Sequence, residues 1–103
     1  LSLKEYLTLN SCPSAIFAAN DEIAIGAIKA LLEQNISVPE KCAVIGFNNI
    51  SLSNFFTPTL TTVNKPIADM AQKACNLLLK QIEGIKCPKE TKLETSLVIR
   101  ESA

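Results

Sequence analysis

The chain has 103 residues, of which 48% are hydrophobic and 19% charged, with ten basic residues balanced by ten acidic ones and no histidine. This composition excludes a disordered chain, and without a basic cluster the residues offer no electrostatic footprint for nucleic acid. No apolar run approaches the roughly 20 residues that a membrane span needs, and no signal-peptide pattern is recognisable. What remains is one small globular domain with a modest core.

Four cysteines are present, and they do not form a recognisable metal or redox motif. Without a C-x-x-C pair or a histidine, no zinc site is predicted, and no cofactor is expected. A disulfide framework is possible by count, but a mixed helix and strand pattern seldom needs one, so we expect reduced thiols of a cytosolic protein without chemistry of their own. Two of them, Cys42 and Cys75, fall on predicted apolar faces.

The first part of the chain predicts a helix, a strand and a second helix. Residues 2–10 have apolar side chains at near-helical spacing behind a capping box. The apolar run 15–19 is too short for a helix and predicts a buried strand. Asn20 then serves as N-cap of a helix expected over 22–34. Open α/β sheets bind ligands where a strand feeds a helix, so Asn20 and Asp21 are the first candidates for a binding site.

The middle of the chain predicts a second strand at 41–47. Strand, helix and strand together predict a right-handed βαβ unit with a parallel pair. A polar loop follows at 48–58 and contains an unexpected aromatic pair, Phe55 and Phe56. Residues 60–63 are β-branched and extended, which is typical of a third strand or a crossover.

A long amphipathic helix is expected over 67–83, with Pro66 in its first turn and Gly84 at its end. Residues 93–99 alternate enough to predict a last strand. The helix has an apolar stripe that other residues widen beyond the needs of a surface helix, formed by Ile67, Met70, Ala71, Ala74, Leu78 and Ile82.

Four stretches carry a family resemblance: PSAIFAANDEIAIGAIKAL, ISVPEKCAVIGFNN, PTLTTVNKP and LETSLVIRES. In this order and spacing they resemble the C-terminal part of a LacI/GalR-type bacterial transcription regulator. The resemblance implies an α/β fold, a parallel-sheet βαβ sandwich that is a partial type I periplasmic-binding-protein-like domain. It would supply the second lobe plus one helix of the first lobe, the helix that begins at Pro66.

The resemblance also implies how the chain fits into a longer protein. Residues 1–103, which open without Met, would form the C-terminal portion of a sugar- or effector-binding and dimerisation domain. The DNA-binding head and most of the first lobe are absent from this sequence, so operator DNA would be contacted only through the absent N-terminal domain. The apolar stripe of helix 67–82 would then be uncovered, and we expect it to pack on a second copy or to shift from its family position.

Two amides are the main effector contacts that the resemblance implies. Asn20 matches a position that hydrogen-bonds effector hydroxyls, and an amide both donates and accepts, as a sugar hydroxyl does. Asn48 stands where the family usually has Asp, so a ligand that needs a full negative charge would be held less well. A plain N-cap and an ordinary Asn-Asn turn are the alternative roles.

Three further residues are candidates for the same site. Asp21 is expected mainly as a helix-terminus residue behind the ligand contacts. Lys65 and Ile67 lie at the crossover into the cleft and would line the pocket by their family position. A solvated loop charge and a core side chain are the simpler roles for these two.

A homodimer is expected from the same resemblance. Ile25, Phe55 and Phe56 resemble the dimer-forming surface, and exposed aromatics on a loop suggest an isologous interface. The two phenylalanines could instead fold back onto their own lobe. We favour dimer contact for Phe56 and Ile25 and leave Phe55 open.

The leading hypothesis is an effector domain of a cytoplasmic, sugar-responsive transcription regulator. A periplasmic sugar-binding protein of a transport system is the first alternative, since it shares the fold. An α/β enzyme of flavodoxin-like or sugar-modifying type is the second, but no nucleophile, base and orienter can be assembled, and no phosphate loop exists. Catalysis is therefore not expected.

Overall fold

The computed structural model describes residues 2–103 and divides the chain into two units. One unit contains the chain up to Asn64 together with Ser96–Ala103, and the other contains Lys65–Thr95.

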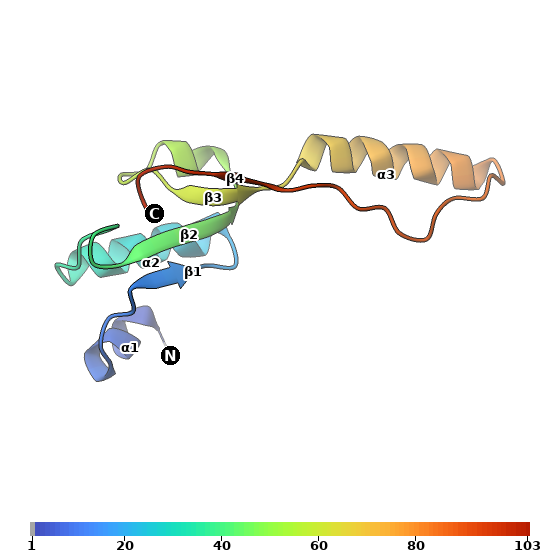
Figure 1. Ribbon diagram of the computed structural model, residues 1–103. Coiled ribbons are helices and arrows are strands. Elements are labelled where there is room, and N and C mark those ends of the chain that lie inside the picture. Colours follow the sequence, from blue (N-terminus) through green and yellow to red (C-terminus); the bar gives the residue numbers. More distant parts are fainter. Residues whose placement is uncertain (1) are drawn as a thin grey trace. The chain divides into compact units, whose positions relative to one another are not determined.

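The first unit is built on a four-stranded sheet with the order β1-β2-β3-β4 (Figure 1). Its strands are β1 (Ala15–Phe17), β2 (Ala43–Asn48), β3 (Thr61–Asn64) and β4 (Ser96–Val98). β1, β2 and β3 run parallel, and β4 pairs antiparallel with β3. The predicted α/β class and the parallel βαβ unit are therefore confirmed, with one antiparallel strand at the edge.

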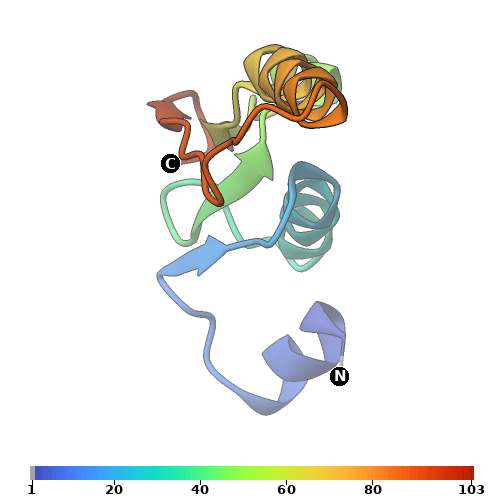
Figure 2. The same ribbon diagram turned by 90° about the vertical axis from the view of Figure 1, so that its right-hand side faces the viewer.

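Helix α2 (Asp21–Glu33) packs against β2 and supplies one side of the core (Figure 2). Asn20 caps it, as predicted, because its Oδ1 accepts a hydrogen bond from the Ile23 N–H at 2.8 Å. Asn35 follows the helix in the left-handed region with φ 58°. Each large aliphatic side chain that α2 buries fully contributes about 1.5–3 kcal/mol of stability. The core cluster consists of Ala18, Ala24, Ile28, Leu31, Val38, Cys42, Val44 and Leu60.

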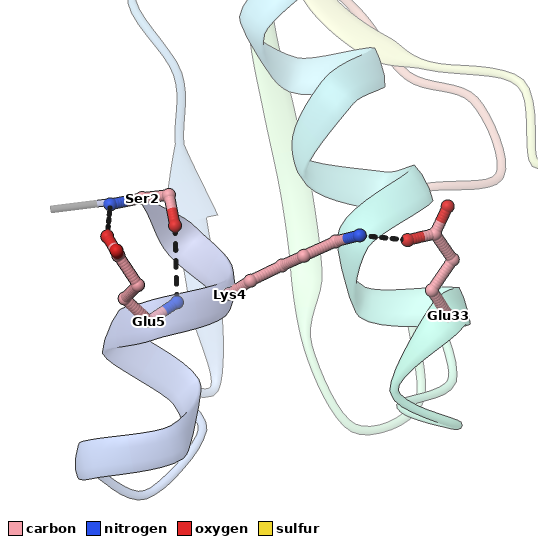
Figure 3. A network of polar contacts seen from close by, with 4 residues as sticks. All are labelled: Ser2, Lys4, Glu5 and Glu33. Atoms are coloured by element: carbon pink, nitrogen blue, oxygen red, sulfur yellow. Dashed lines mark hydrogen bonds and ion pairs between the residues drawn. The ribbon is translucent and has the colours of Figure 1, made fainter.

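Helix α1 (Leu3–Leu9) is joined to the end of α2 by surface contacts, which Figure 3 shows. Ser2 and Glu5 form the predicted capping box, and the Ser2 donors lower the pKa of Glu5. Lys4 forms an ion pair with Glu33 and lowers the pKa of that carboxyl. Because both partners are exposed to solvent, this pair positions α1 more than it stabilises the fold.

The C-terminal residues tie the beginnings of two strands together. Ser102 is buried, its Oγ donates to the Val44 carbonyl at 2.6 Å, and the same Oγ accepts from the Thr61 N–H at 2.8 Å. The Val44 N–H in turn donates to the Ser102 carbonyl at 2.7 Å. This segment therefore fixes β2 against β3 at the end opposite to their carboxyl termini.

Between β2 and β3 lies a short 3-10 helix, η1 (Ser51–Asn54), where the sequence predicts only a loop. Ser53 in this helix is fully buried, although its neighbours on either side are exposed. The fold holds η1 through a polar contact of Ser53 and not through an apolar face. The sequence therefore shows no apolar periodicity that would predict this helix.

The second unit consists of helix α3 (Ile67–Ile82) and the segment that follows it. Pro66 is its N-cap residue, and Gly84 with φ 78° follows its end, close to the prediction. No residue of α3 is buried, so the apolar stripe lies uncovered as expected. Cys75 is exposed, like most of the helix on which it lies. A shallow groove of about 220 Å³ on this unit is lined by Met70, Lys73, Ala74, Leu77, Thr91 and Leu93.

The helices described within residues 2–103 are too short or too polar to cross a membrane.

Candidate functional site

Polar side chains gather where the three parallel strands of the first unit end. Asn20 follows β1, Asn48 is the last residue of β2, and Asn64 is the last residue of β3. Asn48 and Asn64 are partners in the strand register. Parallel strands bring their carboxyl ends to one edge of the sheet, so these amides share the edge at which open α/β sheets bind ligands.

Asn20 has half of its amide engaged in helix capping. Its Oδ1 accepts from the Ile23 N–H, and its side chain is half-buried. Within residues 2–103 its Nδ2 group has no hydrogen-bond partner. Capping therefore leaves two amide protons for a ligand, and the two roles that the sequence offered for Asn20 are compatible.

Asn48 has an unusual backbone conformation and an unusual side-chain environment. Its backbone has φ 111°, a conformation that L-residues adopt at a cost of about 1–3 kcal/mol. Its Oδ1 atom is buried and has no hydrogen-bond partner in the described part of the chain. Buried acceptors are nearly always satisfied in folded proteins, so this acceptor on a strained backbone stands out among the described residues.

Asn49 links the edge amides to an arginine from the far end of the chain. Its Nδ2 donates to Asn64 Oδ1 at 3.0 Å, and its Oδ1 accepts from Arg100 Nη2 at 2.8 Å. The other guanidinium nitrogen, Nη1, donates to the Leu60 carbonyl at 2.7 Å. Neither Asn64 nor Arg100 was predicted as a site residue from the sequence. Asn64 could have been found by the rule that selected the other two amides, a polar side chain at a strand end.

Asp21 lies behind this edge with its side chain completely buried. Its Oδ2 accepts from the Ile50 N–H at 2.8 Å and from Ser53 Oγ at 2.7 Å, and its Oδ1 accepts from Thr62 Oγ1 at 2.5 Å. The carboxylate is closed off from solvent and accepts from three protein donors, which fits the helix-terminus role that the sequence offered for Asp21.

Lys65 and Ile67 belong to the second unit and contact each other within it. The Lys65 carbonyl accepts from the Ile67 N–H at 2.8 Å, and Ile67 begins α3 with 58% of its surface exposed. An exposed side chain rules out the simple core role within this unit. Their contribution to a pocket stays a prediction.

The residues expected at a dimer surface differ in exposure. Phe55 is 79% exposed, the highest value among the large apolar side chains of the described residues. Phe56 and Ile25 are half-buried and pack against the core of their own unit. The side chain that the sequence left undecided is therefore the one most available to a partner.

The described cysteines are all free thiols, and Cys42 is buried. Burial first, and the neighbouring Cys12 second, raise the pKa of Cys42 from 9.0 to about 11. Among residues 2–103, histidine, cysteine and acidic side chains form no group of three that could hold a metal ion.

Comparison with known proteins agrees with this arrangement. Residues 2–103 match the periplasmic binding protein-like domain family. The HTH-type transcriptional repressor PurR of Actinobacillus pleuropneumoniae is 39% identical over 103 residues, which cover 97% of this chain and 31% of that protein. A crystal structure of a LacI family transcriptional regulator from Lactobacillus casei with bound sucrose shares 36% identity and a TM-score of 0.83, over 97% of this chain and 38% of that one.

A crystal structure of the lac repressor dimer, bound to operator and the anti-inducer ONPF, is 28% identical with a TM-score of 0.92. It matches 96% of this chain and 35% of its own chain.

The fold and these matches define the class: the chain belongs to the periplasmic binding protein-like domain family. Within this class the chain is similar to part of the repressor PurR and to part of the lac repressor. The chain spans about a third of the length of the curated repressors it matches, 31% in the case of PurR.

Proposed function

We propose that this chain forms one wall of an effector site in a cytoplasmic transcription regulator, and that the effector is a neutral carbohydrate or a derivative of one. The observation that carries the proposal is Asn48, with its buried, unpartnered Oδ1 on a strained backbone. The edge amides Asn20 and Asn48 are the direct contacts, and Asp21 supports them from behind.

The chemistry of the edge suits a ligand with several hydroxyl groups. Asn20 offers amide protons, and Asn48 offers an acceptor that lacks a donor. Each sugar hydroxyl both donates and accepts, so neighbouring hydroxyls satisfy both amides. The two charged side chains that are bonded into the edge are engaged within the protein, since Asp21 accepts from three donors and Arg100 donates to two neutral oxygens. Neither of these two is free to pair with a charged ligand, which suits a neutral one.

The second wall of the site is assigned to the first lobe, of which the second unit carries a helix. Lys65 and Ile67 follow directly after Asn64 in the chain and would reach the pocket from that side. A ligand that touches both lobes shifts the protein toward one lobe orientation by its difference in affinity for the two orientations. Operator binding would respond through the homodimer, for which Ile25, Phe55 and Phe56 are the proposed contacts.

The first test is a calorimetric titration of the complete protein that contains this chain with a panel of sugars, sucrose and glucose first. Asn48→Gly removes the amide while tolerating φ 111°, so backbone strain does not confuse the result. We expect the affinity for the responsive sugar to fall about tenfold, the value of one to two hydrogen bonds. Unchanged affinity in Asn48→Gly would contradict the site assignment.

A control separates the site from the general surface. Asn54→Ala removes an exposed amide at the end of η1 and should leave affinity within about twofold of wild type, because no contact of this side chain reaches the edge amides. Asn48→Asp adds a second diagnostic. It retains binding if a ligand donor faces this position and abolishes it if an acceptor does, since a carboxylate only accepts.

A further inference from the structure

The burial of Asp21 needs an explanation that its helix position does not provide. A negative charge in the first turn of α2 is already present on Glu22, which is exposed and interacts with the helix dipole at no desolvation cost. Asp21 is instead 0% exposed, and burying a carboxylate is costly unless its hydrogen bonds are satisfied. All three of its donors come from outside α2, so its role lies in what it holds together.

Two branches of this network lead to the turn after Asn48. The first is direct, because the Ile50 N–H donates to Asp21 Oδ2. The second passes through Thr62, whose hydroxyl donates to Asp21 and accepts from the Asn49 N–H at 3.3 Å. The backbone N–H groups of both residues after Asn48 are therefore fixed by the same carboxylate.

The turn that these bonds hold is one that the backbone alone disfavours. Asn48 and Asn49 have φ 111° and 56°, so two consecutive non-glycine residues lie at positive φ. Such conformations persist only where surrounding contacts determine them.

Gly46 in β2 shows how closely the carboxylate is fitted. A Cβ added to Gly46 would overlap Asp21 Oδ1 and would lie 2.9 Å from Leu60 Cδ2. The side chain of Asp21 reaches its three donors only because Gly46 has no side chain.

We propose that Asp21 is a positioning residue for the effector site: through Ile50 and Thr62 it sets the turn that aims the Asn48 amide beside Asn20. Its effect on ligand affinity rests on the proposed function, whereas its effect on the turn does not. Asp21 thus connects the helix that carries one ligand amide to the strand end that carries the other.

The network supplies a matched pair of variants. Thr62→Val and Ser53→Ala each remove one hydroxyl donor from Asp21, and both residues are fully buried. Only Thr62 also contacts the Asn49 N–H. A purely structural role predicts that both variants lose stability and behave alike at the turn. A positioning role predicts that Thr62→Val alone disturbs it.

The experiment measures backbone amide hydrogen exchange by NMR in the complete protein, without any ligand. We expect the Asn49 amide to exchange about fivefold faster or more in Thr62→Val, and to stay within about twofold of wild type in Ser53→Ala. Equal rates at Asn49 in the two variants would overturn the proposal.

Sucrose titrations of the same samples give the second readout. Thr62→Val should weaken binding about fivefold and Ser53→Ala by less than twofold. If wild type fails to bind sucrose while Asn49 exchange responds as expected, the positioning role stands and the sucrose assignment fails. If sucrose binds equally well to both variants, Asp21 does not position the site. Glu22→Gln controls for the charge of the helix terminus and should change neither readout.

Discussion

The two units of this chain keep their apolar residues in opposite places. The sheet unit buries its large side chains on both sides of the contact between α2 and the strands, and Ile28, Leu31 and Leu60 are completely inaccessible. The unit Lys65–Thr95 buries none of the residues of α3, and Ile82 is 73% exposed. The first unit can therefore hold the strained turn at Asn48 and Asn49, because a core supports it, whereas α3 in the second unit has no such core.

Truncating one leucine in each unit should give the largest difference in stability loss between the two units. Leu60→Ala empties a fully buried position and should cost about 2–5 kcal/mol of unfolding free energy. Leu79→Ala removes a side chain that is 59% exposed and should cost less than about 0.5 kcal/mol. Urea denaturation of the 103-residue chain measures both. At a dilution where the chain is monomeric, similar losses in the two variants would contradict this contrast between the two units.

Two glycine substitutions test why each unit needs glycine. Gly46→Ala should cost about 1–3 kcal/mol because its methyl group overlaps Asp21 and Leu60. Gly84→Ala has open space around it and should cost about 1 kcal/mol, because alanine is strained at φ 78°. Thermal unfolding should rank them in this order. A harmless Gly46→Ala would show that Asp21 is not tightly fitted.

The uncovered stripe of α3 should make the 103-residue chain self-associate. Light scattering at increasing concentration is expected to show an average mass above that of the monomer, because an exposed apolar stripe finds a partner. Leu78→Glu, at a position 57% exposed, should shift the chain back toward monomer. A clean monomer at high concentration with α3 still exposed would count against this expectation.

The smallest expected difference between the two units is in the reactivity of their thiols. Alkylation of the native chain at pH 8 should modify the exposed Cys75 and spare the buried Cys42, as mass spectrometry of the peptides would reveal. The pKa of Cys42 is raised in the fold to about 11, so its contribution to stability is complete below pH 9 and is lost as the pH rises toward 11. Cys42→Ala should flatten this decline. An equally steep decline in that variant would assign it to another group.

The sequence predicts most of the scaffold because its signals are local. The cap at Asn20, the apolar face of α2 and the β-branched strands each lie within a few neighbouring residues. The last strand is shorter than predicted, three residues instead of the range 93–99, because it forms only where β3 offers a partner. Strand length thus depends on a pairing that the local pattern does not contain.

The candidate site could be predicted only in part, for the same physical reason. The amides Asn20 and Asn48 follow strands and are visible in the sequence. The contact of Arg100 with Asn49 spans 51 positions, and Asp21 meets Thr62 across 41. Such long-range contacts leave no periodic signal, so the burial of Asp21 and the role of Arg100 appear only in three dimensions.

The central claim is that the two strand-end amides bind one effector together. NMR of the 15N-labelled complete protein follows the side-chain amide signals of Asn20 and Asn48 during a titration with the responsive sugar. Both signals are expected to shift and to saturate with a single dissociation constant, while the signal of the exposed Asn54 amide stays in place. Saturable binding that leaves the Asn20 and Asn48 signals unmoved would contradict this claim.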